Sequence, residues 1–357
     1  MNLIKYKKNI CESNIKIRKA LILLNIIQIK CLIVLDRNKK LIGTLTDGDI
    51  RRSLVDGAKF NEGIFNYVNK KPTAINKKDY VRNKNLKNFE ISKDILLIPL
   101  IDKKKKLVGI IKNNKFEQLK GLSSNLNINV VIMAGGLGTR LRPFSSIIPK
   151  PLIPLKGKPI IEHIMDRFAK NKFKKFFVSI NNSQKIIKAF FKTHKNNYEI
   201  SFINEKKALG TAGSLSLLNK ISKDFFVINC DNIIDCNYQS ILEYHQLNKN
   251  DLTVVVAKKK IDIPYGVFEI NKNKKIQIIE KPSNEILINT GMYIFSKKIL
   301  RFVKKNRKIN MDELIRILIN KKCKIDLFPV ENTEWHDFGQ LSNFFENKRN
   351  FFKFTGE

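Results

Sequence analysis

The sequence has few cysteines and no long apolar run. The five cysteines are scattered and no two form a CxxC pair, which excludes a zinc ribbon and argues against a disulfide framework. A reducing cytoplasm therefore fits this chain best. No apolar stretch reaches the ~18 residues of a membrane helix, because Asn25, Gln28 and Lys30 interrupt the best candidate, residues 20–35. The patch after Lys19 is short and lacks a cleavage site, so we expect no signal peptide.

Acidic residues are also scarce: 32 Asp and Glu stand against 68 Lys and Arg, which gives a formal net charge of +36. A charge of this size is typical of proteins that bind nucleic acids or a membrane surface. However, the lysines do not gather in one tail, and the sequence shows no aromatic stacking platform. We therefore attribute the charge to a general compositional bias, with polyanionic substrates as a second contributor. We expect neither a specific nucleic acid nor a membrane as partner.

The N-terminal third contains an internal repeat. Residues 32–43 and 98–109 each read as strand, turn and strand, at a constant offset of 66 residues. A chain of 357 residues is long enough for two to three domains. The repeat predicts that residues 1–120 form one of them, built from two copies of a small α/β unit at about 1–60 and 61–120.

The segment 121–129 is polar and contains Gly and Ser, so it is the predicted linker to a second domain, 130–357. In that domain short apolar runs alternate with helical patterns, which predicts an α/β fold with a mostly parallel sheet. Ligands of such sheets bind beyond the carboxyl ends of the strands. The expected strands are residues 130–133, 176–180, 225–229, 252–256 and 292–295, and the expected helices are residues 160–169 and 184–191.

A glycine-rich turn follows the first of these strands directly. Its glycines let the backbone approach a ligand closely, its N–H groups can cradle phosphate oxygens, and Arg140 adds a permanent cation. It is not a dinucleotide fingerprint, because Leu141 stands where glycine is required, and no GK[ST] closes it as a Walker loop. Shortly afterwards Lys150 stands between Pro149 and Pro151, and we interpret it as a second phosphate contact.

Two further motifs suit a nucleotide. The segment from Gly210 through Thr211 to Gly213 opens a helix with small residues, which suits a base or sugar edge, and helix packing is the alternative. Asp231 stands at the end of the strand 226–230, near the predicted phosphate contacts, and this suggests a Mg²⁺ ligand. The alternative is a surface Asp that caps a turn.

The order of these motifs, GGxGTRL, PKP, LGTAG, EKP and NTG, resembles the sugar-nucleotide pyrophosphorylases from residue 130 to about 350. The resemblance implies a Rossmann-like nucleotide-diphospho-sugar transferase domain and a Mg²⁺-dependent reaction of a nucleoside triphosphate with a sugar 1-phosphate. It implies catalytic roles for Arg140 and Lys150, and Mg²⁺ ligation by Asp231 and Asp337. It implies nucleotide contacts by Gly135, Gly136, Gly138, Thr139, Gly210, Thr211 and Gly213. It implies sugar-phosphate contacts by Gly266, Glu280, Lys281, Asn289 and Thr290.

The N-terminal repeat resembles a tandem pair of CBS domains, with its best element at residues 43–52. In nucleotide-binding members this resemblance implies that Thr46 touches phosphate and Asp49 holds ribose hydroxyls of an adenine nucleotide. The second copy carries Lys112 and Lys115 at the same offset, so at most one adenosine site is expected. A purely structural or dimerising CBS pair is an equal alternative.

A CBS pair in front of a short pyrophosphorylase resembles the CBS-fused guanylyltransferases that make GDP-glucosamine for legionaminic acid. We therefore expect GTP and glucosamine 1-phosphate as substrates, in a cytoplasmic homo-oligomer that serves surface-glycan or nonulosonic acid biosynthesis. Mannose-1-phosphate guanylyltransferase is the nearest alternative, and thymidylyl or uridylyl transfer follows. A regulatory protein that binds nucleotide sugars without turnover is a further alternative. The presence of Arg140, Lys150 and both metal acids favours the enzyme.

Overall fold

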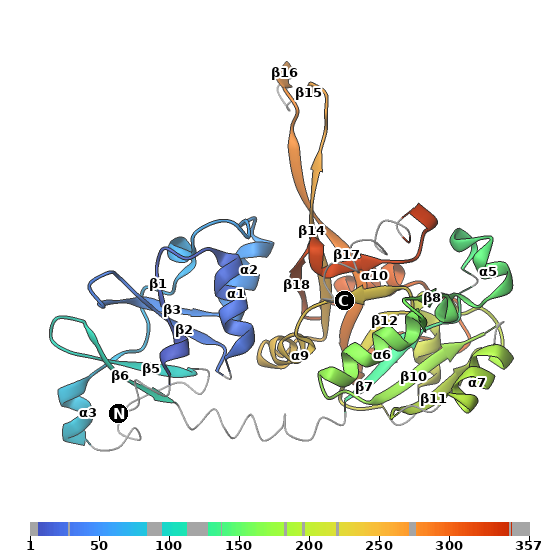
Figure 1. The fold of residues 1–357 in the computed structure, drawn as a ribbon, viewed down its shortest axis with the longest axis horizontal. Coiled ribbons are helices and arrows are strands. Elements are labelled where there is room, and N and C mark those ends of the chain that lie inside the picture. Colours follow the sequence, from blue (N-terminus) through green and yellow to red (C-terminus); the bar gives the residue numbers. More distant parts are fainter. Residues whose placement is uncertain are drawn as a thin grey trace. The chain divides into compact units, whose positions relative to one another are not determined.

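The computed structural model divides the chain into two compact units, Met1–Leu126 and Asn127–Glu357, and each is described by itself (Figure 1). Of the predicted linker 121–129, only residues 128 and 129 are among the described residues. The described residues are 6–27, 29–83, 95–112, 128–136, 138–181, 184–194, 197–218, 221–270, 276–342 and 344.

The N-terminal unit contains two three-stranded sheets with the same pairing pattern. In each, the first two strands are parallel and the last two form an antiparallel hairpin, at the positions where the sequence predicts strand, turn and strand. The first sheet consists of β1 (Ile10–Glu12), β2 (Cys31–Leu35) and β3 (Leu41–Thr46), and the second of β4 (Ile75–Asn76), β5 (Leu97–Ile101) and β6 (Leu107–Lys112). The helices of this unit are α1 (Ile17–Ile26), α2 (Asp47–Val55) and α3 (Lys77–Asn83).

The two hairpins contact each other through equivalent residues. Leu41 N donates to Lys105 O at 2.9 Å, and Leu107 N donates to Lys39 O at 3.1 Å. Strand β2 is buried along its whole length, because Leu32 and Val34 pack under α1 and α2 while its other face packs against β5 and β6. The two copies of the repeat thus share a hydrophobic core and do not form independent domains.

The C-terminal unit is built on a seven-stranded sheet in the order β11-β10-β7-β12-β17-β14-β18. Only β17 runs antiparallel to its neighbours, so the prediction of a mostly parallel sheet is confirmed. Two strands, β11 and β18, were not predicted. In β11, polar residues interrupt the apolar ones. In β18, Pro329 interrupts the strand pattern, because proline is unfavourable inside a strand. The strands are β7 (Asn129–Met133), β10 (Lys175–Ile180), β11 (Glu199–Asn204), β12 (Asp224–Asn229), β14 (Leu252–Asp262), β17 (Ser283–Ser296) and β18 (Ile325–Glu331).

Helices cover both faces of this sheet, because its central strands are apolar on both sides. On β12, Phe225 and Val227 face one core together with α10, while Phe226 on the other side contacts Phe168 of α6. The helices are α5 (Phe144–Ile147), α6 (Ile160–Lys170), α7 (Gln184–Thr193), α8 (Gly210–Gly213), α9 (Tyr238–Leu247) and α10 (Met311–Asn320). None of the helices in the described part of the chain has the length and apolar character needed to cross a bilayer.

Two short pairings flank the sheet. Strand β13 (Asn232–Ile234) pairs antiparallel with β19 (Trp335–Asp337), and β8 (Pro154–Leu155) pairs with β9 (Lys158–Pro159). The first pairing joins the segment after β12 to a segment about a hundred residues further along the chain.

Strands β14 and β17 continue beyond the sheet as a two-stranded ribbon that ends in β15 (Val267–Ile270) and β16 (Ile276–Ile279). Figure 1 shows this ribbon in orange, extending well beyond the sheet. We call residues 258–288 the arm. A bulge marks its base, because Val255 pairs with Met292 whereas Val256 pairs with Asn289. The sequence predicted only the buried inner ends of these strands, since none of the arm residues whose burial the structure describes is buried to create a pattern.

We expect Phe168→Ala to destabilise the C-terminal unit by about 3–5 kcal/mol. Phe168 is fully buried and its ring contacts those of Phe173, Phe176, Phe226 and Tyr238. Urea-induced unfolding measures the loss. The matched control is Ile319→Ala at an exposed position of α10, which should change stability by at most about 0.5 kcal/mol. Equal unfolding midpoints for the two variants would contradict this core assignment.

Candidate active site

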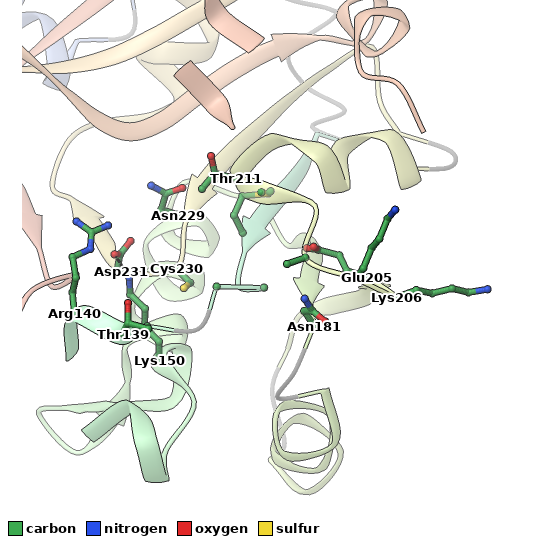
Figure 2. Close-up of a pocket in the computed structure, with 18 residues that line it drawn as sticks. Thr139, Arg140, Lys150, Asn181, Glu205, Lys206, Thr211, Asn229, Cys230 and Asp231 are labelled. Carbon is green, nitrogen blue, oxygen red and sulfur yellow. Dashed lines mark hydrogen bonds and ion pairs between the residues drawn. The ribbon is translucent and has the colours of Figure 1, made fainter. Parts of the chain in front are cut away.

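A cavity of about 510 Å³ lies at the carboxyl ends of β7, β10, β11 and β12. Sheets of parallel strands bind ligands at this edge, so the cavity lies where the sequence predicts a ligand site. Figure 2 shows Thr139, Arg140, Lys150 and Asp231 on one side of the cavity, and Asn181, Glu205 and Lys206 on the other. Its lining consists of Met133, Gly135, Gly136, Gly138, Thr139, Arg140, Lys150, Asn181, Glu205, Lys206, Lys207, Ala208, Gly210, Thr211, Asn229, Cys230, Asp231 and Gly339.

The glycine-rich turn and the PKP lysine line one space, as the sequence predicts for two phosphate contacts. Lys150 Nζ forms an ion pair with Asp231 Oδ2. Burial alone would lower the pKa of Lys150, but the negative charges of Asp231 and Asp337 outweigh it and raise the pKa above its ordinary value. Lys150 therefore stays charged at neutral pH, beside the exposed guanidinium of Arg140.

Asp231 and Asp337 are brought together by the pairing of β13 with β19. Asn232 lies opposite Asp337 in that pairing, and Phe338 N donates to the backbone oxygen of Asp231 at 2.8 Å. A Cβ on Gly339 would lie 2.4 Å from Asp231 Oδ2 and 2.9 Å from Asp337 Oδ1, so both carboxylates border this glycine. Asp231 lines the cavity, whereas Asp337 is not among its lining residues.

These two carboxylates fit a Mg²⁺ ion that takes its remaining ligands from elsewhere. Among the described residues there is no group of three or more His, Cys, Asp and Glu side chains that could hold a metal. Mg²⁺ is commonly held by one or two carboxylates and completes its shell with water and substrate phosphates. Two acids beside a cavity large enough for a phosphorylated ligand therefore suit Mg²⁺ better than a metal that needs an all-protein cage.

A charged cluster fixes the β13–β19 pair from behind. Asp235 accepts a hydrogen bond from Arg167 Nε at 2.6 Å and faces Nε2 of the buried His336 at 3.3 Å. Burial alone would raise the pKa of Asp235, but the bonds from His336 and Arg167 outweigh it and hold the pKa at about 2. His336 thus supports the strand that carries Asp337, which agrees with a structural role for this histidine.

The LGTAG segment serves packing as well as the cavity. Gly210 and Thr211 line the cavity, and Thr211 Oγ1 accepts a hydrogen bond from Met311 N at 2.8 Å, at the start of α10. Gly213 does not line it. A Cβ there would lie 2.8 Å from Leu209 Cβ and 2.9 Å from the backbone oxygen of Arg307, so close packing requires this glycine. Its predicted nucleotide contact stays a prediction.

Three of the predicted sugar-phosphate residues lie on the arm, outside the cavity lining. Gly266 and Glu280 are neighbours there, since a Cβ on Gly266 would lie 3.1 Å from Glu280 Oε2. Lys281 N donates to the backbone oxygen of Tyr265 at 3.2 Å, which continues the pairing of the two strands. Gly266, Glu280 and Lys281 thus form one group, separate from the cavity that they were expected to complete.

The other two, Asn289 and Thr290, lie at the base of the arm, where Asn289 pairs with Val256 and Thr290 belongs to the bulge. Thr290 Oγ1 donates to Val255 O at 2.8 Å, and Gly291 N donates to Asn289 Oδ1 at 3.0 Å. Gly291 has a φ of +77°, and a Cβ there would lie 2.5 Å from Nδ2 of Asn229, which lines the cavity. The NTG motif therefore shapes the bulge beside the cavity, and contact of its side chains with a sugar stays a prediction.

The sequence analysis did not identify the residues that line the side of the cavity opposite Arg140. Asn181 follows β10 and Glu205 follows β11, so both stand at carboxyl ends of parallel strands. Glu205 is buried and accepts hydrogen bonds from Ser179 Oγ and from Leu209 N. Recognition of β11 as a strand would have identified Glu205, because the residue after each parallel strand faces the same edge of the sheet.

In the N-terminal unit, Thr46 and Asp49 form the capping box of α2. Asp49 N donates to Thr46 Oγ1 at 3.2 Å and Thr46 N donates to Asp49 Oδ2 at 2.9 Å. Asp49 also accepts from Arg52 Nη2 at 2.6 Å. These bonds account for the helix start, and an adenine nucleotide at these two residues stays a prediction.

The chain thus has an α/β domain with a cavity at the carboxyl edge of its sheet. The sequence model of the nucleotidyl transferase family matches residues 129–353, and the chain belongs to this family. The model of the CBS domain matches residues 10–56. The Rossmann-like fold class and the N-terminal CBS domain predicted from the sequence are thus confirmed.

Curated relatives match a stretch of this chain about as long as the second unit. The catalytic subunit beta of mannose-1-phosphate guanylyltransferase from Danio rerio is 31% identical over 229 residues, which cover 61% of this chain and 62% of that protein. Mannose-1-phosphate guanyltransferase from Hypocrea jecorina is 32% identical over 225 residues, which cover 60% of this chain and 61% of that protein. The chain thus spans about 62% of the length of the curated relatives that it matches.

Among solved structures, the chain is similar to HddC from Yersinia pseudotuberculosis. The two are 28% identical with a TM-score of 0.50, and the match covers 63% of this chain and 99% of that one. The common part again corresponds to the second unit by extent.

We expect the stabilising effect of Asp235 to depend on pH in a defined direction. Its folded pKa of about 2 lies below the ordinary value of ~3.9. Its contribution is therefore complete above the ordinary pKa and is lost as the pH falls through the folded pKa. Asp235→Asn should be less stable than wild type at pH 6, and the two unfolding curves should converge between about pH 4 and 2. A gap that stays constant over this range would contradict the ion pair.

Proposed function

We propose that the chain transfers a nucleotidyl group from a nucleoside triphosphate to a sugar 1-phosphate and releases pyrophosphate. The observation that supports this most directly is that the glycine-rich turn, Arg140, Lys150 and Asp231 all line the same cavity. Membership of the nucleotidyl transferase family supports the same reaction class. The presence of both Arg140 and Lys150 argues against a protein that binds nucleotide sugars without catalysis.

The reaction is an in-line attack of a sugar 1-phosphate oxygen on the α-phosphorus of the triphosphate. The P–O bond to the β-phosphate breaks, and pyrophosphate leaves. The nucleophile is already an anion, so no general base is required, and the described lining of the cavity contains no histidine. Burial raises the pKa of the Cys230 thiol to about 12, so this thiol stays protonated and is no nucleophile.

The barrier to this reaction is the repulsion between two polyanions. Arg140 and Lys150 lower it by holding phosphate oxygens in position and neutralising their charge. Asp231 and Asp337 would hold Mg²⁺, which when bound supplies further positive charge to the phosphates. Lys150 forms an ion pair with Asp231 at the edge of the cavity, which places a cation beside the acid proposed to hold the metal.

We propose GTP as the triphosphate. The buried carboxylate of Glu205 lines the side of the cavity opposite Arg140 (Figure 2). An ionised carboxylate only accepts hydrogen bonds, and its two oxygens offer about four lone-pair sites. Guanine presents N1–H and N2–H₂ donors on one edge, whereas adenine presents an acceptor at N1. The names of the Danio rerio and Hypocrea jecorina relatives point to the same base.

Two sugars remain as candidates. We propose glucosamine 1-phosphate because a CBS domain precedes a short nucleotidyltransferase, the arrangement of guanylyltransferases that serve legionaminic acid synthesis. Mannose 1-phosphate is the second candidate, and the printed function of the curated relatives favours it. The residues that would discriminate between these sugars lie on or beside the arm.

Arg140→Ala should lower kcat/KM by roughly 10²–10³-fold, the usual effect of removing one preorganised electrostatic contact. The matched control is Arg142→Ala, because Arg142 is also exposed, lies two residues further along, and is outside the cavity lining. Pyrophosphate release with GTP measures both variants. Near-normal turnover of Arg140→Ala, or an equal loss in Arg142→Ala, would contradict the proposed phosphate site.

Glu205→Gln should reduce the preference for GTP over ATP by about 10–100-fold, because an amide nitrogen meets the donors of guanine where an acceptor is required. The ratio of the two kcat/KM values removes any common effect on folding. Glu199→Gln is the control, since Glu199 is exposed at the opposite end of β11. An unchanged ratio in Glu205→Gln would exclude this carboxylate from base recognition.

A further inference from the structure

The carboxylate of Asp231, labelled in Figure 2, has a different partner on each of its oxygens. Lys150 Nζ forms the ion pair with Oδ2, and Asn232 Nδ2 donates a hydrogen bond to Oδ1 at 3.1 Å. Asp231 and Asn232 are only 8% and 6% exposed, so bulk water has little access to the second of these bonds. The Asn232 amide therefore holds one oxygen of the acid that lines the cavity.

The other end of the Asn232 side chain bonds to the only tryptophan of the chain. Trp335 Nε1 donates to Asn232 Oδ1 at 2.9 Å. An indole N–H is a donor only, and a carboxylate accepts, so the amide oxygen must face Trp335 and the amide nitrogen must face Asp231. We call these three side chains, Trp335, Asn232 and Asp231, the relay. Each of its two hydrogen bonds has a single possible direction.

The register of the β13–β19 pair builds the relay. Asn232 pairs with Asp337, and Trp335 stands two residues before Asp337 on β19. Side chains two residues apart share a face of a strand, so Asn232, Trp335 and Asp337 lie on one face of the pair. Trp335 is then a diagonal neighbour of Asn232, which a large aromatic side chain can reach. Asn232 is thus adjacent to one proposed metal acid in sequence and opposite the other.

The bulge at the base of the arm packs against the same amide. A Cβ on Gly291 would lie 3.0 Å from Asn232 Nδ2. The backbone of Gly291 therefore approaches the amide group closely, in a conformation with a φ of +77°. An indole, a carboxylate and a glycine backbone border the Asn232 side chain, and together they allow it one orientation.

The relay leaves the second oxygen of Asp231 directed at the other acid. A Cβ on Gly339 would lie 2.4 Å from Asp231 Oδ2 and 2.9 Å from Asp337 Oδ1, so both oxygens border one small volume. Lys150 reaches Oδ2 on a flexible four-carbon stem and can yield this oxygen to an incoming cation. Asn232 is fixed on three sides, so Oδ1 stays bound when Lys150 moves.

We propose that Asn232 and Trp335 are positioning residues for the metal site. Trp335 orients the Asn232 amide, and the amide holds Asp231 so that Oδ2 faces a divalent cation. Neither residue is among those that line the cavity, so both act through Asp231. This inference rests on the metal site of the proposed function, and the loss of such outer hydrogen bonds typically costs about 10–100-fold in metal affinity.

Binding of Mn²⁺ to the full chain without substrates tests the relay independently of turnover. Mn²⁺ prefers the same oxygen ligands as Mg²⁺, and free Mn²⁺ is measured by electron paramagnetic resonance. Asn232→Leu removes both hydrogen bonds of the amide at nearly constant volume, so the affinity for Mn²⁺ should fall by about 10–100-fold.

The matched control for this variant is Asn248→Leu. The Asn248 amide also donates a hydrogen bond, to Tyr244 O at 2.9 Å. It lies just before β14, which runs parallel to β12 and therefore begins at the edge of the sheet opposite the cavity. Asn248→Leu should leave the affinity for Mn²⁺ unchanged.

The outcomes separate the relay from the proposed function. Equal Mn²⁺ affinities of wild type and Asn232→Leu would overturn the relay, and so would a wild type that binds no Mn²⁺. A reduced affinity, in a protein whose wild type turns over no pair of substrates, would uphold the relay and refute the proposed function. Turnover by wild type with equal affinities would do the reverse.

Trp335→Phe changes the relay more gently. Phenylalanine keeps an aromatic ring but lacks the N–H donor, so we expect the affinity for Mn²⁺ to fall by about 3–10-fold, the effect of one hydrogen bond. The Mg²⁺ concentration for half-maximal turnover should rise by the same factor, while kcat at saturating Mg²⁺ stays near that of wild type. A lower kcat with an unchanged Mg²⁺ dependence would contradict a positioning role.

Tryptophan emission gives a last readout at the site itself. Since Trp335 is the only tryptophan, all tryptophan emission of the chain comes from the relay. Mn²⁺ is paramagnetic and quenches nearby emission, so we expect a saturable decrease in wild type, with a midpoint about 10–100-fold higher in Asn232→Leu. Emission that does not respond while Mn²⁺ is bound would place the ion away from Asp231 and overturn the proposal.

Discussion

The convergence of strand ends at one edge of a parallel sheet is the constraint on which the site depends. Strands β7, β10, β11 and β12 run in the same direction, so the segments that follow them meet although they are far apart in sequence. The glycine-rich turn, Asn181, Glu205 and Asp231 enter one cavity for this reason alone. The antiparallel β17 then provides the route by which the chain leaves the sheet to form the arm.

Charged side chains occupy opposite sides of the cavity at this edge of the sheet. The cavity places Arg140 and Lys150 opposite a buried acid, Glu205, and sets Asp231 between them and Asp337. In the proposed reaction this arrangement would place the phosphates beside Arg140 and Lys150 and the base beside Glu205. The cluster of Arg167, Asp235 and His336 stabilises the β13–β19 pair, and that pair in turn determines where the two acids of the proposed metal site stand.

The sequence predicted the parts of the fold that leave a local pattern. Buried strands such as β7 and β12 are continuous apolar runs, and the glycine-rich turn and PKP lysine follow from their chemistry. Strand β11 was missed because its alternating pattern is weak, and Glu205 was missed with it. Only the resemblance to a known family predicted that Asp231 and Asp337 lie close together, because the β13–β19 pairing joins segments that are far apart in sequence. The extension of the arm away from the cavity has no sequence signal at all.

The most direct test of the central claim is pyrophosphate release by the full chain with Mg²⁺, across four nucleoside triphosphates and the 1-phosphates of glucosamine, mannose, glucose and N-acetylglucosamine. We predict turnover with GTP and glucosamine 1-phosphate, while turnover with mannose 1-phosphate would retain the chemistry and favour the second sugar. Absence of turnover with every pair, with and without added AMP or ATP, would contradict the claim that this cavity catalyses nucleotidyl transfer.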